Sequence, residues 1–153
     1  MNILFVCIGN ICRSPCAHAI LQTLQPTWTI ESAGTHAHNY SSDMDQRMKE
    51  QLSSQGIHFS HKPRQVSEAD IKKATHVFVM EEDNYYSLKM SYDEKYHHKI
   101  HFLREFDPIN PGKIDVSDPY YGGKKGFEDC YHIIERSCTQ LATVLNDTID
   151  EDS

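Results

Sequence analysis

Short apolar runs along the chain alternate with segments in which apolar residues recur every three or four positions. The first run, Ile3 to Val6, is continuously apolar, which is typical of a parallel strand buried on both faces. The second run, Trp28 to Ala33, alternates and suits a less buried strand. Two later runs are Val77 to Met80 and a short one around Ile100 and Phe102. The pattern therefore predicts four strands.

The intervening segments have the apolar spacing of helices. Ser14 can cap the first helix, with Pro15 at its first position. Gly56 can end the second helix. That second helix is expected at Met44 to Leu52. Later helices are expected at Ser67 to Asp70, which resembles a capping box, and at Asp83 to Met90. The last helix is expected along the stripe Phe127, Tyr131, Ile134, Cys138, Leu141 and Leu145.

Strands that alternate with helices predict an α/β fold, a flavodoxin-like four-stranded parallel sheet with helices on both faces. We expect one domain over residues 1–147 and an acidic, frayed tail at 148–153. The stretch from Arg104 to Lys125 is expected to be a long loop, and loops of this length are often functional. In such sheets ligands bind beyond the carboxyl ends of the strands, which favours the turn between strand one and helix one.

Charge and cysteine content narrow the possible partners and the compartment. The 153-residue chain has a formal net charge of −7, which argues against nucleic acid or a membrane surface bound by bulk charge. It has no apolar stretch long enough to span a bilayer, and its start lacks the features of a signal peptide. Five cysteines, an odd number, indicate reduced thiols. We expect a cytoplasmic protein that would bind an anionic substrate in a local pocket.

The turn after the first strand has the residues of an anion-binding nest. Backbone N–H groups that lead into a helix N-terminus can point at an anion, and Gly9 and Asn10 tolerate the positive φ that this curl requires. The amides and the helix dipole would favour the thiolate of Cys7 on the floor of the nest. Arg13 can offer a bidentate fork to phosphate oxygens, and Ser14 can donate a hydrogen bond to the thiolate.

A nucleophile beneath a phosphate, with an arginine over it, predicts phosphoryl transfer through a covalent intermediate. The loop is not a Walker A loop, because the Gly-Lys-Ser/Thr element is missing. We expect no metal and no cofactor, since Arg13 and the amides can carry the charge. The plainer interpretation is that Cys7 is a small buried apolar residue. The strand, the loop Gly and Asn, and the Ser-Pro helix opening favour catalysis.

Residues 1–17 resemble the opening of low-molecular-weight protein tyrosine phosphatases, whose signature is Cys-x5-Arg-Ser at a strand–helix turn. The resemblance continues in order through Ser32 to Thr35, Gly56-Ile57, His61 to Gln65 and Asp118 to Tyr121. It implies hydrolysis of protein phosphotyrosine and of small aryl phosphates, with phosphate, vanadate and similar oxyanions as inhibitors.

The resemblance also implies a role for each residue of the site. Cys7 would be the nucleophile, Arg13 the phosphate clamp, and Asp118 the acid that protonates the leaving oxygen and later activates water. From the residues alone, Asp118 before proline could simply start a turn. The implied substrate- and phosphate-binding residues are Ile8, Gly9, Asn10, Ile11, Cys12, Ser14 and Tyr120. A supporting set that would hold the curl of the loop is Asn10, Ser14, Ser32 and His61.

Some details of the site remain open at this point. Either His38 or Tyr40 could form the wall on the variable-loop side of the pocket. Either Tyr120 or Tyr121 could be a target for a kinase. The resemblance further implies that Cys12, rather than Cys16, forms a disulfide with the oxidised nucleophile.

The chain departs from the family pattern at His18, where Glu is usual, at Glu81, where Asp is usual, and at 41–43, where Gly-x-Pro is usual. We expect these changes to affect stability or substrate preference rather than chemistry. The histidine-rich segment 97–101 is expected to be solvated rather than a metal site.

Three other functions fit the sequence less well. A thioredoxin-coupled arsenate reductase needs two further cysteines after strand three, and residues 17–129 contain none. A non-catalytic phosphotyrosine-binding module would have lost Cys7, Arg13 or Asp118. A metal-binding cysteine protein is disfavoured because Cys7 and Cys12 lack paired ligand spacing with the two distant cysteines.

Overall fold

A four-stranded parallel sheet is the centre of the computed structural model, which describes residues 1–37, 41–110, 112–120 and 122–152. The strands lie in the order β2-β1-β3-β4, and each neighbouring pair is parallel. Their bounds are β1 Asn2–Cys7, β2 Thr29–Gly34, β3 His76–Val79 and β4 Ile100–Phe102. The four expected strands are therefore confirmed.

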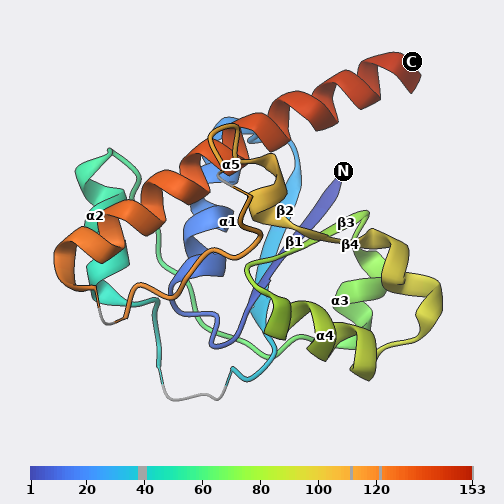
Figure 1. The fold of residues 1–153 in the computed structure, drawn as a ribbon, viewed down its shortest axis with the longest axis horizontal. Helices are drawn as coiled ribbons and strands as arrows, with labels where there is room; N and C mark the ends of the chain where they lie inside the picture. Colours follow the sequence, from blue (N-terminus) through green and yellow to red (C-terminus); the bar gives the residue numbers. More distant parts are fainter. Residues whose placement is uncertain (38–40, 111, 121, 153) are drawn as a thin grey trace.

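Helices cover both faces of this sheet. Their bounds are α1 Arg13–Leu24, α2 Gln46–Ser54, α3 Glu68–Lys73, α4 Glu82–Ser91, α5 Gly123–Asp152, and the 3-10 helices η1 Glu94–Lys99 and η2 Leu103–Phe106. In Figure 1, α1, α2 and α5 gather on one side of the sheet, and α3 and α4 lie on the other. The expected layered α/β architecture is confirmed. In the described part of the chain, no helix is both long and apolar enough to cross a bilayer.

The side chains of β1 alternate between two cores. Ile3, Phe5 and Cys7 pack into the core under α1 and α5, whereas Leu4 and Val6 pack into the core under α3 and α4. All five are almost completely buried, which explains the continuous apolar run. The alternation directs the last side chain of the strand, that of Cys7, to the side on which α1 begins.

Two segments are more regular than we expected. Leu103–Phe106 forms η2 and α5 begins at Gly123, so the loop between strand four and the last helix is shorter than 104–125. Helix α5 continues to Asp152, so it includes residues 148–152, for which we expected an acidic, frayed tail. After Gly126 the helix contains neither glycine nor proline, so nothing in the sequence interrupts its backbone hydrogen bonds.

Helix α2 begins two residues later than the apolar spacing suggested. Asp45 precedes it and accepts a hydrogen bond from the backbone N–H of Arg47 at 2.8 Å, which is an N-cap contact. Met44 therefore lies outside the helix, although its side chain is buried. Gly56, with a φ of 82°, follows the end of the helix as expected.

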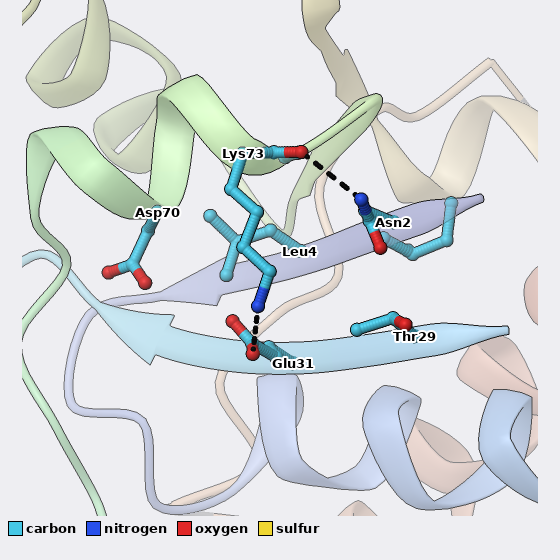
Figure 2. A pocket seen from close by; sticks show the side chains of 8 residues that line it. Asn2, Leu4, Thr29, Glu31, Asp70 and Lys73 are labelled. Atoms are coloured by element: carbon cyan, nitrogen blue, oxygen red, sulfur yellow. Dashed lines mark hydrogen bonds and ion pairs between the residues drawn. The ribbon is translucent and has the colours of Figure 1, made fainter.

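Helix α3 is fastened to the sheet near the amino ends of β1 and β2. Figure 2 shows Lys73 Nζ donating to Glu31 Oε1 at 3.0 Å, and Asn2 Nδ2 donating to the carbonyl oxygen of Lys73 at 3.4 Å. Ser67 and Asp70 form the expected capping box. The cavity beside these contacts measures about 10 Å³, enough for about one water molecule.

Candidate active site

The thiol of Cys7 lies at the carboxyl end of β1, inside the loop that leads to α1. Its Sγ accepts a hydrogen bond from the backbone N–H of Asn10 at 3.3 Å and lies 2.9 Å from Ser14 Oγ. Because Ser14 Oγ accepts from Asn10 Nδ2 at 2.8 Å, its own hydrogen is free to point at the sulfur. The amino end of α1 also faces this sulfur. Together these groups favour a negative charge at the base of the loop.

Two expectations about this loop are corrected. Asn10 has a φ of 57°, as the curl requires, but Gly9 is not among the residues with positive φ. Ser14 is not the cap of α1, because the helix begins at Arg13 and Cys12 is its N-cap. The Ser14 hydroxyl is committed to the thiol instead, and it is completely buried. Its role is therefore to orient the sulfur rather than to start the helix.

Neighbouring segments hold the carbonyl groups of the loop outward. The carbonyl oxygens of Cys7, Ile8 and Ile11 accept from backbone N–H groups at 2.9, 2.8 and 2.6 Å, respectively. The donors are Thr35, His36 and Asp45. Since a trans peptide directs C=O and N–H to opposite sides, these contacts leave loop amides free to point toward the centre. The result is the nest of amides that the sequence predicted.

Gly34 allows β2 to approach the loop closely. A Cβ at this position would lie 2.5 Å from the carbonyl oxygen of Ile8 and 2.9 Å from the Cβ of Ala37. The carbonyl oxygen of Ile8 cannot move easily, because it belongs to the backbone of the phosphate loop, the turn over residues 7–14. Glycine at the end of β2 is thus a condition for the geometry of the site.

A series of hydrogen-bonded polar side chains runs from the Cys7 thiol to the back of the loop. Asn10 Oδ1 lies 2.7 Å from His61 Nε2, and it also accepts from the backbone N–H of Arg64 at 3.0 Å. Ser32 Oγ lies 3.4 Å from the same histidine nitrogen and 3.2 Å from His18 Nδ1. The structure thus brings together the four supporting residues that the resemblance implied, and it adds His18 to them.

Burial favours the neutral form of His18 and His61, the two histidines in this hydrogen-bonded series. Burial and the nearby His61 lower the pKa of His18 to about 4. Burial and the charge of Arg64 lower the pKa of His61. A neutral His61 carries a single N–H, which suits donation from Nε2 to the oxygen of Asn10. That donation fixes the Asn10 side chain, whose amide nitrogen in turn bonds Ser14.

Arg13 is buried and held by three contacts. One terminal nitrogen donates to the carbonyl oxygen of Val116 at 2.9 Å, and the other lies 3.2 Å from Glu81 Oε1. The second nitrogen also lies 3.9 Å from Asp118 Oδ2. Burial by itself lowers the pKa of Arg13, but the charges of Cys7 and Glu81 outweigh it, so the pKa is raised. The guanidinium is therefore charged and fixed beside the sulfur.

The pocket above the sulfur has a volume of about 210 Å³. Asp118 borders it with a side chain that is 59% exposed, and Asp118 Oδ1 accepts from the backbone N–H of Tyr120 at 3.0 Å. The guanidinium carbon of Arg47 lies 5.1 Å from the ring centroid of Tyr120 and 4.5 Å from that of Phe127. The lining residues are Cys7, Ile8, Gly9, Ile11, Cys12, Arg13, Asp45, Asp118, Tyr120 and Phe127.

Sequence reasoning missed several residues that line this pocket or hold Arg13 beside it. Glu81 was noted only as a departure from the family pattern, although its place directly after β3, at the same edge of the sheet as Cys7, was an available signal. Asp45, Phe127 and the carbonyl oxygen of Val116 gave no recognisable signal. Two positions considered for the wall, His38 and Tyr40, lie outside the described residues, as does Tyr121.

All five cysteines are buried and free. A hydrogen bond with Cys130, together with burial, raises the pKa of the Cys12 thiol well above its usual value. Burial, together with the nearby Cys130, Cys138 and Glu135, also raises the pKa of Cys16. Over the ranges that the structure describes, no group of three or more His, Cys, Asp or Glu side chains is arranged to hold a metal ion. In the histidine-rich segment, His97 is half-buried, with Nε2 3.0 Å from the carbonyl oxygen of Tyr92.

This geometry can hold a phosphate monoester over a thiol, with an arginine beside it and a carboxyl group at the mouth. It is the kind of site found in cysteine-dependent phosphatases. The chain belongs to the low molecular weight phosphotyrosine protein phosphatase family, because residues 2–152 match that family. The resemblance inferred from the sequence is thereby confirmed.

Individual relatives agree with this assignment. The low molecular weight phosphotyrosine protein phosphatase of Schizosaccharomyces pombe is 37% identical, over 86% of this chain and 88% of the relative. The crystal structure of a protein tyrosine phosphatase from Entamoeba histolytica superposes with a TM-score of 0.90 at 36% identity, covering 97% and 98% of the two chains. The YwlE arginine phosphatase from Geobacillus stearothermophilus superposes with a TM-score of 0.89 at 30% identity, covering 99% and 97%.

Proposed function

We propose that this protein hydrolyses phosphotyrosine in proteins, and small aryl phosphates, through a phosphocysteine intermediate. One observation carries the proposal: the sulfur of Cys7, the guanidinium of Arg13 and the carboxyl group of Asp118 border one pocket. The remaining groups around the sulfur support a thiolate there, since the backbone of Asn10 and the hydroxyl of Ser14 both direct hydrogen bonds at it.

In the first step, the thiolate of Cys7 attacks phosphorus. The bond from phosphorus to the phenolic oxygen breaks, and Asp118 donates its proton to that oxygen. The loop amides and Arg13 bind the equatorial oxygens, whose negative charge they stabilise. The distance of 3.9 Å between Arg13 and Asp118 Oδ2 supports a clamp and an acid that act on the same phosphate ester.

In the second step, water attacks phosphorus of the phosphocysteine. The carboxylate of Asp118, left by the first step, accepts a proton from that water. The phosphorus–sulfur bond breaks, and inorganic phosphate and the Cys7 thiolate are released. Free phosphate and vanadate would occupy the same nest and inhibit.

The walls of the pocket favour an aromatic leaving group. Ile8, Ile11, Tyr120 and Phe127 present apolar surface above the sulfur, which suits a phenyl ring. The side chain of phosphoserine is too short to use these walls. Phosphoarginine is the competing substrate, because a related structure is that of an arginine phosphatase. The apolar wall at Ile11 favours the aryl ester over a charged guanidinium.

Oxidation is the expected means of inhibition, with Cys12 as the protecting partner. Peroxide would oxidise the Cys7 thiolate to sulfenic acid, with water as the reduced product. Attack by the Cys12 sulfur would then form a Cys7–Cys12 disulfide and release a second water. Cys130, which shares a hydrogen bond with Cys12, is the competing partner of Cys12 in this scheme.

The free thiols support a reducing compartment such as the cytoplasm. We treat residues 1–147 as one catalytic domain that needs no cofactor. Phosphotyrosine proteins are the proposed partners, rather than nucleic acid or a membrane. The arsenate reductase alternative stays disfavoured because residues 17–129 contain no cysteine.

A turnover assay tests this proposal. Peptides that carry phosphotyrosine, phosphoserine or phosphoarginine in the same surrounding sequence would be compared, with Cys7→Ser as the control for contaminating phosphatase. We expect release of phosphate from the phosphotyrosine peptide alone, and none with Cys7→Ser. Preferential hydrolysis of the phosphoarginine peptide would overturn the proposed substrate, and binding of the phosphotyrosine peptide without turnover would favour the non-catalytic module.

A further inference from the structure

A second hollow adjoins the active-site pocket, between the phosphate loop and α4. Its volume is about 470 Å³, and its lining combines the apolar or aromatic Ile8, Tyr86 and Met90 with the polar Thr35, His36, Asp83, Ser87 and Ser91. Ile8 lines both this hollow and the pocket over Cys7, so the two are continuous along the surface of one side chain. Figure 1 shows α4 beside the edge of the sheet where β1 ends.

The hollow carries exposed apolar side chains that the fold does not require. Met90 is 88% exposed and Tyr86 is 56% exposed, and they lie one turn apart on α4. The packing face of the same helix is formed by Asn84 and Leu88, which are buried. The solvent face of a surface helix normally carries polar residues, so adjoining apolar side chains there indicate a binding surface. Ile8, 37% exposed, extends this surface to the active site.

We propose that this hollow is a subsite for an apolar side chain that flanks the phosphotyrosine of a polypeptide substrate. The inference rests on the proposed function and deepens it by naming a feature of the substrate. With its phosphotyrosine in the pocket, a polypeptide continues past the mouth on both sides, and a residue one to three positions away lies within about 4–11 Å along the chain. The substrate itself therefore brings a side chain to the hollow.

The chemistry of the rim agrees with an apolar occupant. Thr35 Oγ1 and His36 Nδ1 lie 3.1 Å apart and bond each other, so these two atoms do not require a polar ligand. The exposed carboxylate of Asp83 disfavours an acidic side chain by charge repulsion. The unbranched thioether of Met90 can adapt to apolar side chains of different shape.

Peptide kinetics with a matched pair of variants test the subsite. Phosphotyrosine peptides would carry Leu, Ala or Asp at each of the three positions on either side. We expect one position at which Leu raises kcat/KM about 3- to 10-fold over Ala, as for partial burial of one apolar side chain, and at which Asp lowers it. Met90→Ser should reduce the Leu-to-Ala ratio toward one. Ile149 is an exposed apolar residue of α5, so Ile149→Ser is the matched control and should have the same Leu-to-Ala ratio as the parent.

A small substrate separates this effect from a change in the catalytic site. Para-nitrophenyl phosphate cannot reach the hollow, so Met90→Ser should hydrolyse it at the parental rate. Hydrolysis of the peptides without a preference for Leu, or an equal preference in parent and Met90→Ser, would overturn the subsite and leave the proposed function standing. Failure of the parent to hydrolyse any phosphotyrosine peptide would overturn both.

Discussion

The guanidinium of Arg13 and the carboxylate of Glu81 lie 3.2 Å apart beneath the phosphate loop. Arg13 is almost completely buried, and the side chain of Glu81 is 20% exposed. The pair joins the start of α1 to the turn after β3, two segments that the parallel sheet places at the same edge. Glu81 is therefore a positioning residue for the clamp, and it offsets the burial of the positive charge.

The first prediction removes the charge of Glu81. Glu81→Gln should raise the KM for phosphotyrosine and weaken inhibition by vanadate about 10-fold, because a charge-assisted bond to Arg13 is lost. Glu81→Asp keeps the carboxylate and should lie between Glu81→Gln and the parent. Steady-state kinetics with vanadate titration provide the measurement. Parental vanadate affinity in Glu81→Gln would show that Val116 alone positions the arginine.

The second prediction concerns the acid. Asp118→Ala should lower kcat for phosphotyrosine by about 10²–10⁴, the usual range for a lost general acid. The loss should shrink for aryl phosphates whose leaving groups have a low pKa, since these need no proton. A series of substituted phenyl phosphates measures this dependence. An equal loss across the series would assign Asp118 to the turn that it forms with the backbone of Tyr120.

The third prediction concerns stability and pH. The folded state lowers the pKa of His18 from 6.5 to about 4, so between these values the unfolded chain binds more protons. The free energy of unfolding should therefore fall as pH drops from about 6.5 to about 4, by on the order of 1–3 kcal/mol, and His61 adds in the same direction. Urea unfolding at a series of pH values measures this slope.

A matched histidine variant isolates the contribution. His18→Asn should flatten the slope over this window, whereas His98→Asn, at an exposed position of η1, should leave it unchanged. The carboxylates with lowered pKa, such as Asp70 and Asp107, are present in the parent and in both variants, so their contribution cancels in the comparison. An unchanged slope in His18→Asn would contradict the assignment.

The fourth prediction concerns oxidation. Mild peroxide should inactivate the enzyme, and dithiothreitol should restore it, because Cys12 traps the sulfenic acid of Cys7. In Cys12→Ser, the fraction of its own starting activity that is recovered should be much smaller than in the parent. Cys130→Ser removes the hydrogen-bond partner of Cys12, and its activity should still be restored by dithiothreitol. Peptide mapping that finds a Cys7–Cys16 or Cys12–Cys130 link instead would contradict the scheme.

Local signals in the sequence were sufficient for the fold and for the phosphate loop. A continuous apolar run located β1 because a strand buried on both faces leaves no polar positions, and alternation located the less buried β2. The loop was recognisable because Cys7, Asn10, Arg13 and Ser14 are close in sequence and each has a chemical reason to be there. The positive φ of Asn10 and the contact from Ser14 to the sulfur were both within reach of that reasoning.

Contacts between distant segments were not accessible in the same way. The bond from Arg13 to the carbonyl oxygen of Val116 depends on the path of a loop more than a hundred residues later, and a backbone oxygen has no sequence signal. The Ser14 hydroxyl had two physically reasonable uses, and only the structure distinguishes the thiol from the helix cap. The extension of α5 was underestimated because acidic composition was taken as a sign of fraying, although no helix breaker follows Gly126.

The most direct test of the account is to find the covalent intermediate. A phosphotyrosine substrate would be mixed with the enzyme, the reaction stopped within its first turnover, and the peptide that contains Cys7 analysed by mass spectrometry. The account predicts one added phosphoryl group on the sulfur of Cys7, which disappears as phosphate is released. A phosphoryl group on another residue, or full turnover with no phosphoryl group on Cys7 at any time, would contradict the central claim.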